Sequence, residues 1–380
     1  MNRHDIVKLP LSCSSLCAYL IGESLLLYSK STQSVYGFEK GDAYLFLKID
    51  ELINSCSYQE IVERFPTVDA TLLKKMYDFA NCAEVVDSIE YESDIEAGVC
   101  VEDDLSRVFY RLDDVLFAIS YPNGDLFKSL HPVYEHLHVN KQDAKIIISV
   151  DFIKRGDLWG VKWNNTPVEM EMPEARLATY IQDQMRTYVY QAQSYLISLH
   201  SASVEKDDKV LVMPAVAESG KTTLTATLLH KGFKLFSDEV TVMDFKGYIH
   251  PLPFCMNVKE GSWTILKEMY PHLHTKDVHS RFDNQNIRFL PPENIQKERK
   301  KATYIVFPKY IQNAKTSLVA LSATDTLLKI KEAHYQVQHD MDQNKFELIL
   351  KNLISLPSYM LEYSNLEEAE DLINKLISEG

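Results

Sequence analysis

Residues 209–230 read KVLVMPAVAESGKTTLTATLLH, and this stretch decides the fold. Its first six residues are mostly apolar and predict a strand, while residues 222–230 predict a helix. The loop between them, residues 215–220, ends in glycine and is followed by Lys221. A strand, a loop that ends in Gly-Lys-Thr and a helix together form the setting of a phosphate-binding loop.

The physical roles in such a loop follow from backbone geometry and charge. Successive N–H groups at the loop and the helix start point into one concavity and bind phosphate oxygens. Gly220 lets the backbone approach without a Cβ, Lys221 brings a positive charge to the β and γ phosphates, and the Thr222 hydroxyl is placed to ligate Mg²⁺. We therefore expect ATP and Mg²⁺ as cofactors, held by Glu218, Ser219, Gly220, Lys221, Thr222 and Thr223.

One position departs from the full loop pattern. Alanine stands at position 215, where the pattern has its first glycine. If φ there were positive, the loop would be strained by about 1 kcal/mol or more. The alternative interpretation of the whole stretch is a chance Gly-Lys-Thr at a helix start, and the strand before it and the helix after it favour phosphate binding instead.

A second apolar stretch, residues 233–240, is expected as a strand that delivers Asp238 and Glu239 at its end. A carboxylate beside a γ-phosphate can hold Mg²⁺ and can take the proton from an attacking hydroxyl. Acidic pairs are also common in solvated turns, which is the alternative for these two residues. The phosphate loop upstream favours the catalytic and metal-binding interpretation.

These pieces form an ordered set together with a histidine before the loop strand. The set comprises His200-Ser201, Val210-Leu211-Val212, Ser219-Gly220-Lys221-Thr222, Lys231-Gly232-Phe233, Leu235 and Ser237-Asp238-Glu239. In order and spacing it resembles HPr kinase/phosphorylase and the HPr-kinase-related proteins of peptide-biosynthesis clusters. Glu239 stands where that pattern can have a second aspartate.

The resemblance implies a phosphoenolpyruvate-carboxykinase-like α/β core. It also implies that Asp238 is the base and a metal ligand, that Glu239 assists, and that His200 lies near the transferred phosphate. A histidine hydrogen-bonded inside the core is the alternative for His200. Relatives often carry Pro-x-Pro and then a basic residue, a pattern matched here by residues 251–253 and by Lys259, which could hold a substrate phosphate or be a plain surface lysine.

The N-terminal quarter predicts a small winged-helix-like module. Residues 25–28 and 35–38 form the strands of a hairpin, and three short helices follow. Ser57 with Glu60 predicts a capping box at the second helix, and Asp69 is expected to cap the third. The segments Val35-Tyr36-Gly37-Phe38 and 41–47 resemble the PqqD-like domains that recognise leader peptides, so the resemblance implies a peptide or protein partner.

Two domains are therefore expected: residues 1–95, the PqqD-like domain, and residues 96–380, the ATP-binding catalytic domain. The acidic residues 90–104 are a candidate linker, and the strands expected over residues 115–163 would form the front of the catalytic sheet. The predicted fold class is α/β, with a mixed α+β sheet in an HPr-kinase-like core and a small winged-helix-like N-terminal domain.

Composition sets the remaining limits. Hydrophobic residues make up 46% of the 380, enough for a sizeable core, and the net charge of −14 disfavours nucleic acid and anionic membranes as partners. No apolar run is long enough to cross a bilayer, and no secretion signal is evident at the start. The six scattered cysteines favour free thiols over a zinc site, so we expect a cytoplasmic protein, and the resemblance adds a homo-oligomer.

The function expected from these features is an ATP-dependent kinase. It would transfer the γ-phosphoryl group to a hydroxyl, either a serine of a peptide or protein or a small metabolite, within ribosomal-peptide biosynthesis. The alternative is a non-catalytic module that binds nucleotide and a peptide or protein. A third possibility is nucleotide hydrolysis with no acceptor.

Overall fold

The computed structural model describes residues 5–81, 107–140, 144, 146–164, 166–168 and 170–379. These residues form a mixed α/β fold with sheets of four, six, ten and three strands. The predicted α/β class is therefore confirmed. The boundary expected at residue 95 and the acidic linker lie outside the described residues, so the division into two domains stays a prediction.

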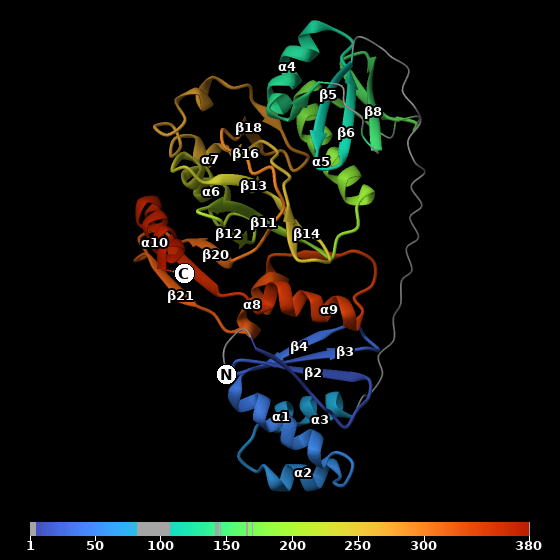
Figure 1. Cartoon of the computed structure of the whole chain (residues 1–380), viewed down its shortest axis with the longest axis vertical. Helices are drawn as coiled ribbons and strands as arrows, with labels where there is room; N and C mark the ends of the chain where they lie inside the picture. The colour runs from blue at the N-terminus through green and yellow to red at the C-terminus, as the bar shows by residue number, and fades with distance from the viewer. Residues whose placement is uncertain are drawn as a thin grey trace.

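The N-terminal unit is an antiparallel sheet with helices on one face (Figure 1). Its strands, in sheet order, are β1 (Ile6–Leu9), β2 (Leu16–Ile21), β3 (Ser24–Ser29) and β4 (Val35–Phe38). The helices are α1 (Lys40–Leu52), α2 (Tyr58–Arg64) and α3 (Ala70–Ala80). The predicted hairpin is confirmed as β3 and β4, whereas β1 and β2 were not predicted.

Helix caps in this unit follow the local sequence. Ser57 accepts a hydrogen bond from the backbone N–H of Glu60, whose carboxylate accepts one from the Ser57 N–H. This is the predicted capping box. Asp69 likewise accepts from the Leu72 N–H at 3.0 Å, as expected at the start of α3.

The middle of the chain forms a six-stranded sheet of its own. In sheet order its strands are β10 (Glu171–Pro173), β9 (Leu158–Trp163), β8 (Ile146–Arg155), β6 (Val115–Ser120), β5 (Arg107–Leu112) and β7 (His138–Val139). The expectation that this region extends the catalytic sheet is wrong. Its strands pair with one another instead. The helices α4 (Gly124–Tyr134) and α5 (Glu174–Ala192) form a core with this sheet, and that core also includes Val242, Leu252, Phe254, Ile287 and Phe289 from later in the chain.

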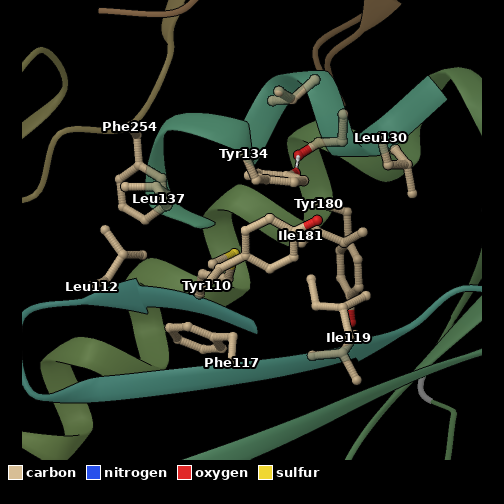
Figure 2. Packing of buried hydrophobic residues seen from close by; sticks show 14 of the residues in the cluster. Tyr110, Leu112, Phe117, Ile119, Leu130, Tyr134, Leu137, Tyr180, Ile181 and Phe254 are labelled. Atoms are coloured by element: carbon tan, nitrogen blue, oxygen red, sulfur yellow. Dashed lines mark hydrogen bonds between the residues drawn. The ribbon is translucent and has the colours of Figure 1, made fainter. Parts of the chain in front are cut away.

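Large aromatic side chains pack with aliphatic ones in this core (Figure 2). Tyr110 and Phe117 rise from the sheet toward Tyr134 of α4 and Ile181 of α5. The buried hydroxyl of Tyr134 has a partner, because it donates to the Ala178 carbonyl at 2.5 Å. Large rings with satisfied hydroxyls make a rigid block that can hold α5 in place.

The phosphate loop belongs to the largest sheet. In order along the sheet it contains β19 (Lys300–Lys301), β15 (Tyr248–His250), β14 (Val240–Met243), β11 (Ile197–Lys206), β12 (Lys209–Pro214), β20 (Tyr304–Tyr310), β23 (Ser358–Tyr363) and β21 (Ser317–Ala320). Two further strands, β13 (Lys234–Ser237) and β22 (Tyr335–Val337), also pair with β11. The parallel pairs are β12 with β20 and β20 with β23, so the carboxyl ends of these three strands meet at one edge.

Helices cover both faces of this sheet. On one face lie α6 (Lys221–His230) and α10 (Leu366–Glu379). On the other lie α8 (Ala323–Glu332) and α9 (Gln343–Ile349), placed between this sheet and the N-terminal one (Figure 1). Phe346 of α9 stacks on Tyr28 of β3 at 5.2 Å, so one apolar core joins the N-terminal unit to the phosphate-loop sheet.

The remaining elements form a small cap beside α6. They are the strands β16 (Met256–Lys259), β18 (Asn286–Leu290) and β17 (His279–Ser280), with the short helix α7 (Glu260–Trp263). Irregular turns complete the chain: the 3₁₀ segments Glu135–Leu137 and Pro271–Thr275 and the π segment Leu350–Ile354. Within the described part of the chain, none of the helices has the length and apolar character to cross a bilayer.

Among the described cysteines, Cys13 differs from expectation. Cys17, Cys56 and Cys255 carry free thiols. Cys13 is disulfide-bonded, so the prediction of free thiols is wrong for this residue.

Candidate active site

The loop predicted to bind phosphate joins the carboxyl end of β12 to α6. Gly220 is the N-cap of α6 and adopts a left-handed φ of 86°, and no side chain caps this helix end. The first N–H groups of any helix lack intrahelical partners. At α6 they are therefore available to an anion, and the helix dipole favours negative charge there.

Glycine is required at position 220 for two reasons. Its φ lies in the left-handed region, and a Cβ there would overlap the Tyr363 hydroxyl. That hydroxyl instead donates to the Gly220 carbonyl at 3.1 Å. The Tyr310 N–H donates to the Ser219 carbonyl at 2.9 Å, so β23 and β20 hold the loop from one side.

The strain considered at Ala215 is not present. Among the described non-glycine residues with a positive φ, Ala215 does not occur, whereas Glu218 has a φ of 64°. Ala215 is buried, and its N–H donates to the His200 carbonyl at 3.3 Å. Alanine therefore fits its position, and the unusual backbone conformation lies three residues later.

The predicted site residues line one cavity of about 620 Å³. They are His200, Glu218, Ser219, Gly220, Lys221, Thr222, Thr223, Asp238, Glu239 and Lys259. The cavity also contains Asn257, Ser262, Arg281, Asp283 and Gln285, which were not predicted. The fold thus brings residues from four separate segments to the start of α6.

Two carboxylates sit at a break between strands. Residues 233–240 were expected as one strand, but β13 ends at Ser237 and β14 begins at Val240. Asp238 and Glu239 occupy the gap, where β11 exchanges one partner strand for the other. Outside the ladder, their side chains can face the cavity instead of alternating across a sheet.

Asp238 is the group most closely tied to the loop. The Lys221 ammonium donates to the Asp238 carbonyl, and the Thr222 hydroxyl donates to its Oδ2 at 3.1 Å. Its Oδ1 is buried, without a hydrogen-bond partner among the residues that the structure describes. Burial raises the pKa of Asp238 to about 6, although Lys221 opposes this shift.

Lys221 is also buried at the base of the cavity. Lys221 is only 8% exposed. Burial lowers the pKa of its ammonium, although the charges of Asp238 and Glu239 act to raise that pKa. This ammonium lies beside the uncapped N–H groups of α6, which favour a further anion. Phosphate oxygens at the loop would provide one.

Glu239 is held in a different way. The Arg186 guanidinium donates to its Oε2 at 2.8 Å, the Asn257 amide donates to the same oxygen at 3.3 Å, and Arg281 lies 3.6 Å from Oε1. Burial would raise the pKa of Glu239, but the two guanidinium groups outweigh it and lower the pKa to about 2. Glu239 is therefore a permanently ionised partner of two arginines.

Sequence reasoning missed those arginines. Arg186 lies on α5, a helix that its apolar spacing indicates. The one signal for Arg186 in the sequence was its charge next to the buried Met185. Arg281 lies between β17 and β18 and had no local signal. Both are about 40 or more residues from Glu239 in sequence, so only the packing of α5 and the small cap brings them there.

His200 and Lys259 also line this cavity. The His200 N–H donates to the His334 carbonyl at 3.0 Å, and burial, together with Lys221, lowers the pKa of its imidazole. A neutral imidazole is therefore favoured. Lys259 is half-buried at the end of β16 and forms no ion pair with any of the described residues.

The oxygen donors at this site suit a hard cation. No group of three or more His, Cys, Asp and Glu side chains is arranged to hold a metal ion in the described ranges. The buried Oδ1 of Asp238 and the hydroxyl of Thr222 nevertheless offer oxygen ligands beside the loop. Proteins in general bind Mg²⁺ through one or two such oxygens, together with substrate phosphates and water.

Comparisons with known proteins add little to this geometry. No protein-family model matches the chain, and no curated protein matches it. Among solved structures, the chain is similar to the Hpr(Ser) kinase/phosphatase from Coxiella burnetii, with 11% sequence identity and a TM-score of 0.22. The match covers 48% of this chain and 99% of that one, and it is too slight to support any inference about activity.

Proposed function

We propose that this chain is an ATP-dependent kinase that transfers the γ-phosphoryl group to a hydroxyl. The observation that carries the proposal is the contact of Asp238 with Lys221 and Thr222 at the uncapped start of α6. Phosphate-binding groups and a carboxylate that can accept a proton thus meet in one cavity.

Each residue has a role in the proposed step. The backbone N–H groups at the start of α6 and the Lys221 ammonium hold the β and γ phosphates. Asp238, with a pKa near 6, accepts the proton of the attacking hydroxyl. A bond forms between that oxygen and the γ-phosphorus as the bond to the β–γ bridging oxygen breaks, and ADP leaves.

Thr222 and Asp238 are the residues that would hold Mg²⁺. The cation would reduce the negative charge on the phosphates during transfer. The unpartnered Oδ1 of Asp238 supports this assignment, because a buried acceptor without a donor is costly unless a cation or water satisfies it.

Glu239 and His200 assist in this proposal without taking the proton. Glu239 pairs with Arg186 and keeps Arg281 at the cavity wall, where the positive charge of Arg281 favours phosphoryl oxygens. Neutral His200 can accept or donate a hydrogen bond near the transferred group. Lys259, which lacks an acidic partner in the described chain, is available to a substrate anion.

The acceptor proposed first is a serine of a peptide or protein, with a small metabolite as the other choice. Support comes from the N-terminal unit, which resembles PqqD-like peptide-binding domains and has β4 at the edge of its sheet. An extended peptide can add a strand to such an edge. Together with the resemblance to HPr-kinase-related proteins, this suggests a role in ribosomal-peptide biosynthesis and a homo-oligomeric kinase.

A Lys221→Ala variant tests the proposal. Transfer of radiolabelled γ-phosphate to a seryl peptide library should fall by about a thousandfold or more, since the charge on the phosphates is no longer offset. Lys231→Ala, at the opposite end of α6, serves as the matched control and should transfer normally. Equal transfer by the two variants would contradict the kinase assignment.

A second candidate is a non-catalytic nucleotide-binding module. The ammonium of Lys221 already donates to the Asp238 carbonyl, which favours a loop that grips nucleotide without turning it over. Isothermal titration with ATP, compared with phosphate release and transfer over hours, separates the two functions. Binding without either reaction would favour this second candidate, and phosphate release without transfer would indicate hydrolysis.

A further inference from the structure

A second cavity lies on the opposite side of the phosphate loop. It has a volume of about 330 Å³ and shares the loop residues Val216, Ala217, Glu218 and Ser219 with the active-site cavity. Its other walls come from the end of β20, from Met360 of β23 and from the last turn of α8. Since β12 lies between β11 and β20 in the sheet, the loop separates the two cavities.

The two cavities differ in chemistry. The active-site cavity holds Asp238, Glu239 and Arg281 around the loop lysine. The second is lined by apolar and aromatic groups, with Lys329 and Glu332 as its polar side chains on α8 and Lys309 on β20. Phe307 is buried and Tyr310 is 49% exposed, so one wall is packed and one ring is accessible.

The position of this second cavity matters for a bound donor. In parallel sheets, ligands bind beyond the carboxyl ends of the strands, and the cavity lies at that end of β12 and β20. The transferred phosphoryl group and its acceptor need the side with Asp238. The rest of a nucleotide can leave the loop on another side, and this cavity begins at the loop itself.

We infer that the second cavity receives the nucleoside of a nucleoside triphosphate, an inference that rests on the proposed function. Its volume falls in the range of small-molecule pockets, about 300–1,000 Å³. The side chains of Tyr310 and Met360 offer surfaces on which a base can pack. Glu332 can accept a hydrogen bond from an amino group of the base, and Lys329, 4.0 Å from it, can donate one.

The competing donor is an inorganic polyphosphate. Pyrophosphate or tripolyphosphate would need the loop and Lys221 alone and would leave the second cavity without a role. The two donors therefore make opposite demands on residues that never touch the transferred group. That difference gives a direct test.

The test compares ATP with inorganic tripolyphosphate by isothermal titration on the full chain. We expect ATP to bind at least about tenfold more tightly. Met360→Trp, which fills the second cavity, should weaken ATP by at least about tenfold and leave tripolyphosphate unchanged. Leu328→Trp, at a 50% exposed position of α8 outside the cavity, is the matched control and should change neither affinity.

Equal affinities for ATP and tripolyphosphate, both lost in Lys221→Ala, would overturn the nucleoside subsite while the phosphate site stands. Failure of both ligands to bind would overturn the proposed function itself. A second measurement needs no variant: photolabelling with 8-azido-ATP should modify residues 307–310, 329–333 or 360. Labelling confined to residues of the active-site cavity would contradict the inference.

Discussion

The N-terminal unit and the phosphate-loop core are both sheets covered by helices, yet the lysines named below and the acidic groups beside them differ in burial. In the N-terminal unit, the pairs Lys40–Glu23, Lys48–Glu51 and Lys74–Asp78 lie at the surface, with every side chain at least 39% exposed. In the core, Lys221 and Asp238 are less than one tenth exposed.

This difference teaches where function resides. Exposed ion pairs contribute little to stability and cost little to lose. Buried charges carry a desolvation penalty of several kcal/mol each, so a fold keeps them only with compensation or a use. Lys221, Asp238 and Glu239 surround one cavity, and on this basis we assign the proposed chemistry to the core.

The largest expected effect comes from Asp238→Asn. We expect phosphoryl transfer to fall by about 10²–10⁴-fold, because the variant cannot accept the hydroxyl proton. Thermal unfolding should stay at or above the wild-type temperature, because burial already disfavours the charge of Asp238. A variant that keeps its activity would remove the chemical role assigned to the core, and one that unfolds would make Asp238 structural.

The second effect is a dependence of the rate on pH. Burial raises the pKa of Asp238 to about 6, so the basic form exists above that pH. The rate at limiting ATP, which reports the titration of the free enzyme, should therefore fall about tenfold per pH unit below pH 6. This fall in rate below pH 6 should be absent from the residual activity of Asp238→Asn. If the fall persists in that variant, another group is responsible for the titration.

Glu239→Gln should affect stability more than chemistry. Without the Glu239 carboxylate, the buried Arg186 guanidinium loses an ionised partner. We therefore expect the free energy of unfolding to fall by about 2–3 kcal/mol at pH 7. The folded pKa near 2 lies below the ordinary 4.5, so the ionised carboxylate stabilises the fold above pH 4.5 and this contribution is lost as pH falls toward 2.

Urea unfolding at pH 7 and pH 3 measures this contribution. The difference between wild type and Glu239→Gln should shrink at pH 3. Glu268→Gln, an exposed position elsewhere on the chain, is the control and should unfold as the wild type does. A gap that stays constant across this pH range would exclude the ion pairs as its source.

The smallest effect is expected in the N-terminal unit. Ser57→Ala removes the cap of α2 and should lower stability by about 1 kcal/mol. Affinity for ATP should not change, because α2 lies far from the phosphate loop (Figure 1). Hydrogen exchange of residues 58–64 with ATP titration measures both, and a loss of ATP affinity would show that the two units are less separate than their charges suggest.

Much of the fold and the site could be predicted from local patterns. The strand, loop and helix around Gly220, the capping box at Ser57 and the β3–β4 hairpin each depend on residues close together in sequence. Local steric preferences and hydrogen bonds decide such elements. The predicted members of the site also meet in one cavity. The loop pattern alone gives residues 218–223, whereas His200, Asp238, Glu239 and Lys259 were predicted from the ordered set of motifs around it.

The rest depends on contacts between distant segments. The six-stranded sheet is separate from the phosphate-loop sheet because its strands find their pairing partners within residues 107–173, which strand patterns alone cannot reveal. The break of the expected strand at Asp238 arises where β11 changes partners. The linker and the domain boundary remain predictions.

The sequence by itself determined which residues can bind phosphate, because the order of glycine, lysine and hydroxyl along a short loop sets those positions. Only the tertiary structure decided what the two neighbouring carboxylates can do. Burial raises the pKa of Asp238, whereas the guanidinium groups of Arg186 and Arg281 lower the pKa of Glu239. Electrostatic environment depends on groups that are near in space and remote in sequence, and no local pattern contains it.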